Sequence, residues 1–110
     1  MTRKSKVEAG TDNIFADLGL PEAGPHFLKA QIVAELYRLA TAAKLTQAQV
    51  GKRLGISQPE VSRMFKGHFR EYSVERLIEF LTGFDRDVDI VVRPRKKAGK
   101  AGRITFRPAA

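Results

Sequence analysis

The chain has 110 residues, of which 43% are hydrophobic, and a formal net charge of +8. This length suits one small domain with tails, and the absence of cysteine excludes a disulfide framework and a thiolate metal site. No apolar run approaches the roughly 20 residues of a membrane span, and the first ten residues lack the apolar segment of a signal peptide. We therefore expect a cytoplasmic protein.

The positive charge is concentrated at the two ends of the chain. Residues 1–6 contain three Lys or Arg and residues 93–110 contain seven, and neither segment contains Asp or Glu. Residues 7–92 hold ten basic and twelve acidic side chains, so their net charge is −2. Basic segments of this kind indicate a polyanionic partner, and the alternative is a tail that only keeps the protein soluble.

The first predicted elements are a leader and a long helix. Residues 1–25 are expected to be irregular, with one helical turn over residues 14–18. Over residues 27–44 the apolar side chains return at helical spacing, which predicts an amphipathic helix packed on a core. Its inward side chains are Leu28, Ile32, Val33, Leu36, Leu39, Ala40 and Ala43.

Two short helices with a tight corner between them are predicted next. Thr46 and Gln49 form a capping box, in which the two residues hydrogen-bond to each other's backbone, and Ser57 and Glu60 form a second box. Gly55 lies between the boxes and suits the left-handed C-cap of the first helix. Both helices are therefore expected to start and stop at defined residues.

This pair of helices is a helix-turn-helix, placed at residues 46–67 in a domain of residues 26–84. Pro59 falls in the first turn of the second helix, where a helix tolerates its missing N–H. Gly51 lies in the middle of the first helix, at a cost of about 1 kcal/mol relative to Ala. We expect its missing Cβ to let a neighbouring helix approach closely.

The second helix of the motif has a polar outer face. Val61, Met64 and Phe65 are expected to point inward, and the opposite face suits the major groove of DNA, where Gln pairs with adenine and Arg with guanine. The predicted base-reading residues are Gln58, Pro59, Ser62 and Arg63. The N–H groups at the start of the first helix suit a phosphate oxygen. The predicted phosphate contacts are Thr46, Gln47, Ser57, Lys66, His68 and Arg70.

These assignments have structural alternatives. The motif can be an ordinary helical corner in a protein that never binds DNA. Gln47 can be a solvent-exposed residue of a first helical turn. Arg63 can form a surface ion pair with Glu60, three residues earlier on the same helix. The polar outer face favours the DNA-binding interpretation, because a purely structural helix does not need it.

The sequence predicts no catalytic site, metal site or cofactor. His26 and His68 are far apart, and no His, Cys or carboxylate group has the spacing of metal ligands. Neither Ser57 nor Ser62 lies in a nucleophile elbow. We therefore expect a protein that is not an enzyme.

A fourth helix and a strand complete the predicted elements. Ser73 caps the helix and Gly83 ends it. Residues 85–94 alternate with a period of two, which predicts a strand with an apolar face made of Val88, Ile90 and Val92. The strand is expected to pair with residues 104–106 or with its own copy, and we favour a role in dimerisation. Residues 95–110 form a basic tail.

Residues 46–67 resemble the helix-turn-helix of the Cro/C1-type, or XRE, family of phage repressors and bacterial regulators. The matching features are the Thr46-Gln47 start, the run Leu54-Gly55-Ile56-Ser57-Gln58, the pair Val61-Ser62 and the closing Gly67. The resemblance implies a mainly α, lambda-repressor-like DNA-binding domain of four to five helices, to which this chain adds a C-terminal β-strand. The family usually has Ala at the position of Gly51, a change that we expect to be tolerated.

Three further phrases, NIFADLGLPEA, EYSVERLIEFL and DVDIVVRP, resemble HigA-like antitoxins of type II toxin–antitoxin systems. This resemblance implies a protein that neutralises a RelE-like ribonuclease toxin and represses its own operon. The acidic and apolar leader then either docks on the toxin or covers the core. We therefore predict a homodimeric bacterial repressor that binds an inverted-repeat operator at the nucleoid. The alternative is a module whose main role is to neutralise the toxin.

Overall fold

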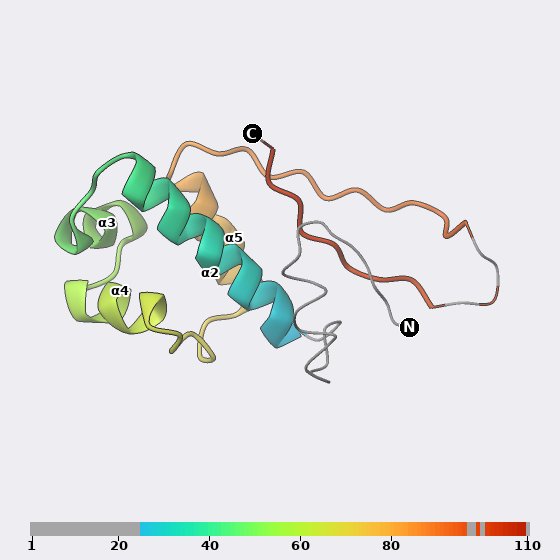
Figure 1. The fold of residues 1–110 in the computed structure, drawn as a ribbon, viewed down its shortest axis with the longest axis horizontal. Helices are drawn as coiled ribbons and strands as arrows, with labels where there is room; N and C mark the ends of the chain where they lie inside the picture. Colours follow the sequence, from blue (N-terminus) through green and yellow to red (C-terminus); the bar gives the residue numbers. More distant parts are fainter. Residues whose placement is uncertain (1–24, 97–98, 100, 110) are drawn as a thin grey trace.

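The computed structural model describes residues 25–96, 99 and 101–109, and the helical turn expected at residues 14–18 lies outside them. Four helices form in the described part: α2 (Pro25–Ala42), α3 (Gln47–Leu54), α4 (Gln58–Phe65) and α5 (Val74–Thr82). α2 is the long central helix, α5 packs along it, and α3 and α4 pack on each other at one end (Figure 1). The mainly helical prediction is therefore confirmed.

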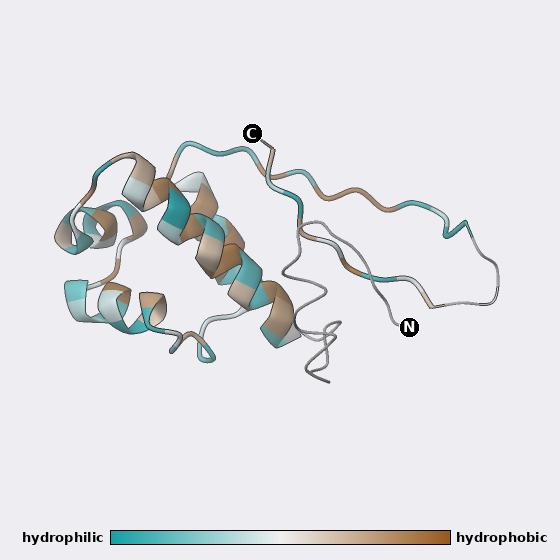
Figure 2. Cartoon of the chain, viewed as in Figure 1, coloured by the Kyte–Doolittle hydropathy of each residue, from teal (hydrophilic) through white to brown (hydrophobic). Residues whose placement is uncertain are grey.

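The core forms where α2 meets α4 and α5. Its fully buried side chains come from all four helices and include Ile32, Leu36, Val50, Met64, Leu77 and Phe80. Burying one such side chain stabilises the fold by about 1.5–3 kcal/mol. Brown, hydrophobic stretches follow α2 in Figure 2, whereas α3 and α4 are more hydrophilic. Because α2 ends at Ala42 and not at residue 44, Ala43 is exposed and does not join the predicted core.

Each short helix starts at the residue that its capping pattern predicts. Gln49 N donates to the Thr46 hydroxyl at 3.1 Å, and Thr46 N donates to Gln49 Oε1 at 2.8 Å. The corresponding distances between Ser57 and Glu60 are 3.2 and 2.9 Å. Each box satisfies two backbone N–H groups that a helix start would otherwise leave unpaired. α3 and α4 therefore have defined first residues despite their length of eight residues each.

Two glycines shape the corner between α3 and α4. Gly55 ends α3 in the left-handed region, with φ of 77°, and its N–H donates to Gly51 O at 2.8 Å. A Cβ added to Gly51 would lie 2.5 Å from the backbone oxygen of Ile56. The close neighbour of Gly51 is therefore the corner and not another helix. Alanine does not fit there without a shift of this backbone, which corrects the expectation that it is tolerated.

After α5 the chain forms an arm with two extended limbs, an outgoing limb of residues 86–96 and a return limb of residues 101–109 (Figure 1). Neither limb is a strand in the described residues, and no backbone hydrogen bond joins the described parts of the two limbs. The β-strand predicted at residues 85–94, with its face of Val88, Ile90 and Val92, is therefore not supported by the described residues.

The charges of the two limbs explain why they do not form a ladder. Arg93 and Arg95 of the outgoing limb and Arg103 and Arg107 of the return limb line the same hollow between the limbs. Like charges placed opposite each other destabilise a pair of strands. An alternating pattern creates an amphipathic segment, but a strand also needs a partner whose side chains are compatible.

The arm is attached to the helical core at two places. Phe84 is buried directly before the outgoing limb, and Phe106 of the return limb packs partly buried against the core cluster. Residues 101–109 of the segment predicted as a basic tail therefore run back toward the domain, and Phe106 contacts the core. Its Arg side chains are exposed along the way.

Candidate nucleic-acid interface

The inner side of α4 attaches this helix to the core. Val61 and Met64 are fully buried, and Phe65 is half-buried against the core cluster. The Phe65 ring also meets the ring of Tyr37 from α2 edge-on, with centroids 5.2 Å apart. Such an aromatic pair adds about 0.5–1.5 kcal/mol beyond the area it buries. α4 is therefore held in one orientation relative to α2.

The outer side of α4 is open to solvent. Gln58, Pro59 and Arg63 are exposed and Ser62 is half-buried, so all four predicted base-reading residues lie on the accessible side of one helix. The structure gives Arg63 no ion pair among the described residues. The alternative pairing of Arg63 with Glu60 is therefore not formed, and the guanidinium has no partner within the described part of the chain.

Glu60 is occupied by the cap of α4. Its carboxylate accepts from Ser57 N at 2.9 Å. The pKa of Glu60 is lowered, first by this backbone hydrogen bond, then by the Ser57 hydroxyl, with a smaller contribution from the positive charge of Arg63. Glu60 therefore fixes the start of the helix that carries Arg63, without neutralising it through direct contact.

The start of α3 carries the second group of predicted contacts. Thr46 is exposed and Gln47 is half-buried. The Thr46 oxygen accepts the Gln49 N–H, and the Ser57 oxygen accepts the Glu60 N–H. A hydroxyl that accepts one hydrogen bond still has its own O–H to donate, so both side chains retain a donor for a phosphate oxygen. Capping and phosphate binding are compatible at these two residues.

The loop after α4 carries three exposed groups predicted to contact phosphate, Lys66, His68 and Arg70. The loop is anchored to the core by Phe69, which is buried and whose ring stacks on the His26 ring with the two ring centroids 5.1 Å apart. Nζ of Lys29 on α2 also donates to the Arg70 carbonyl at 3.0 Å. These contacts place the loop beside α4.

Sequence reasoning missed a cluster under this face. The Tyr72 hydroxyl is buried without a hydrogen-bond partner in the described residues, close to the charges of Glu60, Arg63 and Arg76. Arg76 pairs with Glu79 at 3.4 Å and its guanidinium lies over the Phe80 ring at 4.8 Å. Burial raises the pKa of Tyr72, so the hydroxyl stays protonated. No pattern in the sequence identifies this cluster, because Tyr72 lies before α5 and the charges around it come from separate elements.

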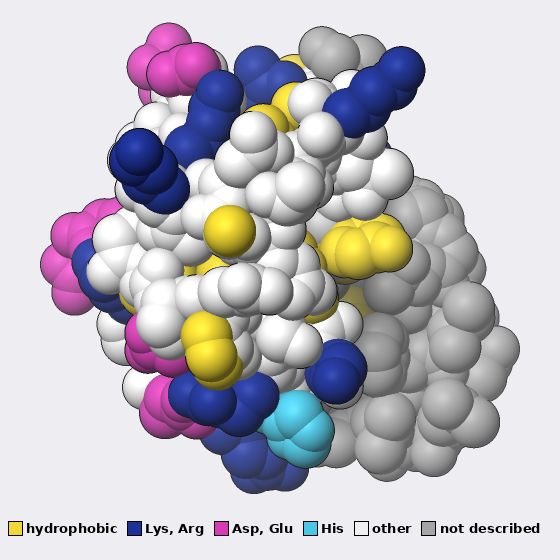
Figure 3. Space-filling view, turned by 90° about the vertical axis from the view of Figure 1, so that its left-hand side faces the viewer, with side chains coloured by type: hydrophobic (Ala, Val, Ile, Leu, Met, Phe, Trp, Pro, Cys, Tyr) yellow, Lys and Arg dark blue, Asp and Glu magenta, His cyan; other side chains and the backbone are white. Residues whose placement is uncertain are grey.

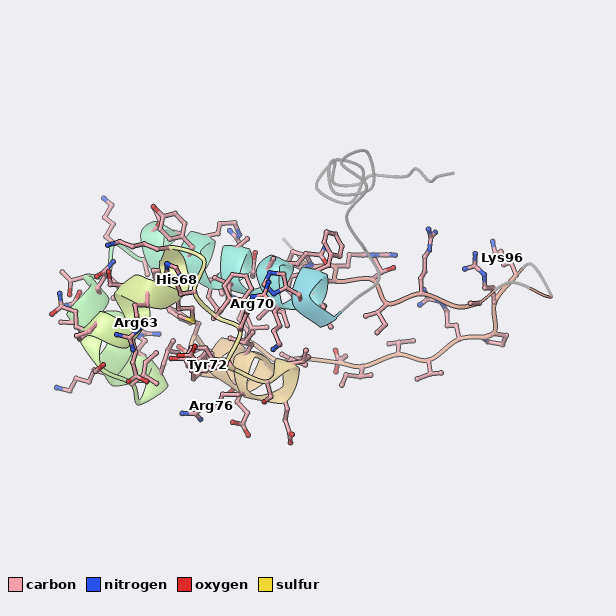
Figure 4. All side chains as sticks on the ribbon, turned by 90° about the horizontal axis from the view of Figure 1, so that it is seen from below. Arg63, His68, Arg70, Tyr72, Arg76 and Lys96 are labelled. Carbon is pink, nitrogen blue, oxygen red and sulfur yellow. The ribbon has the colours of Figure 1, made fainter. Side chains whose placement is uncertain are left out.

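Figure 4 shows that Arg63, His68, Arg70, Tyr72 and Arg76 gather at the helical end of the molecule, whereas Lys96 lies at the far end of the arm. Seen from the end formed by α3 and α4, a mainly uncharged centre is bordered by Lys and Arg side chains, with Asp and Glu side chains along one side (Figure 3). An uncharged centre with cations at its border suits base edges flanked by phosphates. The described residues contain no group of three His, Cys, Asp or Glu that could hold a metal ion, and none of their helices is long and apolar enough to cross a membrane.

Comparisons with known proteins agree with this geometry. A family model described as a helix-turn-helix domain matches residues 14–93. The chain belongs to this helix-turn-helix family. It is also similar to a solved structure named "Putative XRE Family Transcriptional Regulator", with 36% identity and a TM-score of 0.74 over 81% of this chain and 100% of that chain. A comparison with curated proteins finds no match. The XRE type of the motif at residues 46–67 is thus confirmed, and the HigA-like resemblance stays a prediction.

Proposed function

We propose that this helix-turn-helix protein is a sequence-specific DNA-binding transcriptional regulator, in which α4 enters the major groove. The observation that carries the proposal is that α4 has a buried apolar side and an exposed polar side. Val61 and Met64 are fully buried beneath it, whereas Gln58, Pro59 and Arg63 are exposed above. A helix of this shape offers polar side chains to a groove while the core holds it in place. The similar XRE regulator supports the same proposal.

The side chains divide into two roles. Gln58 and Arg63 form bidentate hydrogen bonds with adenine and guanine, each worth about 1–3 kcal/mol of discrimination against a wrong base, and Pro59 and Ser62 contact a thymine methyl. The phosphate contacts come from both sides of α4. They are Thr46, Gln47 and Ser57 on one side and Lys66, His68 and Arg70 on the other, all of which are exposed or half-buried.

The proposal is tested by selecting bound oligonucleotides from a random pool at two salt concentrations. We expect an enriched inverted repeat, because two copies of α4 would read half-sites about one helical turn, or ~34 Å, apart. The affinity is expected to fall as salt rises, because bound cations release counterions from the phosphates. A pool that shows salt-dependent binding and no enriched sequence would defeat base reading.

The operator would be occupied by a homodimer. Ile90 and Val92 of the outgoing limb are 79% and 90% exposed, and Val88 on the same side is 37% exposed. Exposed apolar side chains favour association with a partner that buries them, and the same limb of a second copy offers the same apolar side chains. A chain truncated before Asp87 is then expected to be a monomer by light scattering. An unchanged dimer mass would exclude this limb as the joint.

Repression of its own operon and neutralisation of a RelE-like toxin complete the proposal. Their support is the HigA-like resemblance of the sequence, and the two roles are compatible in one protein. The test is to search beside the gene for a small basic reading frame and to co-express any such protein with this chain; the lack of such a reading frame counts against the toxin role. Co-purification of the two proteins and relief of growth arrest support neutralisation, whereas independent elution of the two proteins contradicts it.

A further inference from the structure

The two faces of the arm differ in chemistry. On the outgoing limb the alternate residues Val91, Arg93 and Arg95 line the hollow between the limbs, and on the return limb Arg103, Thr105 and Arg107 do the same. Side chains two residues apart in an extended chain point to the same side. Pro94, Lys96 and Gly102, which have the other parity, also line the hollow, whereas Ile90, Val92 and Ile104 are exposed apolar side chains outside it. The charged side chains of the lining are all cations, and we call this lining the basic face of the arm.

The basic face has no counter-ion within the described chain. The hollow has a volume of about 430 Å³, and the charged side chains lining it are Arg93, Arg95, Lys96, Arg103 and Arg107. No carboxylate lines it, and none of these five side chains forms an ion pair in the described residues. Several cations around one space repel each other, and a bound anion would offset this repulsion. The charge of the hollow therefore favours a polyanion as its ligand.

We propose that the basic face of the arm is a second, sequence-independent nucleic-acid site, which binds a phosphate backbone outside the half-site read by α4. Arg63 and Lys96 lie at opposite ends of the molecule (Figure 4), whose longest dimension is 46 Å. The phosphates near the arm are therefore expected to lie away from the half-site that α4 contacts. A protomer held on DNA by α4 has a high local concentration of phosphates near the arm.

The phosphates come from one of two sources, a flanking stretch of the same duplex or a second duplex. In the first case the arm lengthens the footprint of each protomer. In the second case the protein joins two DNA segments. The inference rests on the charges of the arm and does not require that α4 read bases. Failure of the proposed base reading therefore leaves the arm site standing, and the two can be told apart.

The test uses two charge-matched double variants of the full chain. Arg95→Gln with Arg103→Gln removes one cation from each limb. Lys44→Gln with Arg86→Gln removes two exposed cations that lie outside the helix-turn-helix, form no ion pair in the described residues and do not line the hollow. The affinity of each protein for a random-sequence 36-base-pair duplex is measured over a range of salt concentrations. All four substitutions are at exposed positions, so the fold is expected to persist, and circular dichroism checks this.

The arm variant is expected to lower the slope of log affinity against log salt by about two, because each released counterion contributes ~0.9. The control variant is expected to keep the slope of the parent protein. Equal slopes for the arm variant and the parent would overturn the proposal. Binding of the arm to vesicles with anionic lipid, combined with unchanged duplex binding in the arm variant, would also overturn it.

Two further measurements distinguish the sources of phosphate. If the arm holds flanking DNA, the parent protein prefers the 36-base-pair duplex over a 16-base-pair duplex by more than the arm variant does. If it holds a second duplex, beads carrying one duplex capture a labelled second duplex through the parent protein, and several-fold less through the arm variant. If neither the length preference nor the capture depends on Arg95 and Arg103, the arm site does not exist.

Discussion

Gly51 offers a direct test of the corner that sets α4 relative to α3. A Cβ at this position would lie 2.5 Å from the Ile56 carbonyl oxygen, and ordinary contact begins near 3.4 Å, so the backbone must open by about 0.9 Å. Overpacking of this kind costs ~1–3 kcal/mol. Replacing Gly by Ala inside a helix raises the free energy of unfolding by ~1 kcal/mol through helix propensity, which offsets part of this cost. With a cost near the middle of its range, we expect Gly51→Ala to lower the free energy of unfolding by about 1 kcal/mol in total.

For a domain of this size, 1 kcal/mol corresponds to a fall in Tm of about 4–8 °C, which a thermal melt followed by circular dichroism resolves. The matched control is Lys52→Ala, at the next and exposed position of α3, where Lys and Ala differ little in helix propensity. Its Tm is expected to stay close to that of the parent. A Gly51→Ala protein that melts higher than the parent would refute the close approach, because helix propensity alone would then explain the result.

Four other substitutions test the capping and the buried hydroxyl. Ser57→Ala and Ser73→Ala each remove a helix N-cap and are expected to lower the free energy of unfolding by about 1 kcal/mol in urea denaturation. Only Ser57→Ala should also weaken DNA binding, because Ser57 caps the proposed recognition helix α4, whereas Ser73 caps α5. Glu60→Gln keeps the cap but cannot titrate. Because the folded pKa of Glu60 is lowered, its carboxylate contributes stability at neutral pH that is lost as the pH falls through that pKa. The Tm of the parent relative to Glu60→Gln should therefore fall between about pH 6 and pH 3, and a constant difference would contradict this. Tyr72→Phe is expected to leave stability unchanged or raise it by up to about 1 kcal/mol, since the hydroxyl has no hydrogen-bond partner in the described residues. A clear loss would show that the hydroxyl is satisfied in solution.

The features predicted correctly from the sequence are local ones. Thr46 and Ser57 each specify a helix start through a partner three residues away, so their capping boxes form as expected. The exposed face of α4 follows from helical spacing combined with the burial of Val61 and Met64. For these features, a short stretch of sequence contains both interacting partners.

The features that were missed depend on residues distant in sequence. Whether residues 85–94 form a strand depends on a partner, and the described return limb places Arg103 and Arg107 around the same hollow as Arg93 and Arg95. Periodicity within one segment does not contain that information. The sequence of the loop after α4 does not predict the burial of Phe69 and Tyr72, because only the folded domain creates their contacts. The pKa of Tyr72 likewise depends on charges brought together by α4 and α5.

The central claim is that the outer face of α4 reads bases. The most direct measurement compares the affinities of Arg63→Ala for the selected operator and for random DNA of equal length. Arg86→Ala is the control, since it removes one exposed charge outside the motif. We expect Arg63→Ala to lose about 1–3 kcal/mol on the operator and much less on random DNA, and to accept other bases at one position. Equal losses on both DNAs, matching those of Arg86→Ala, would contradict base reading by α4.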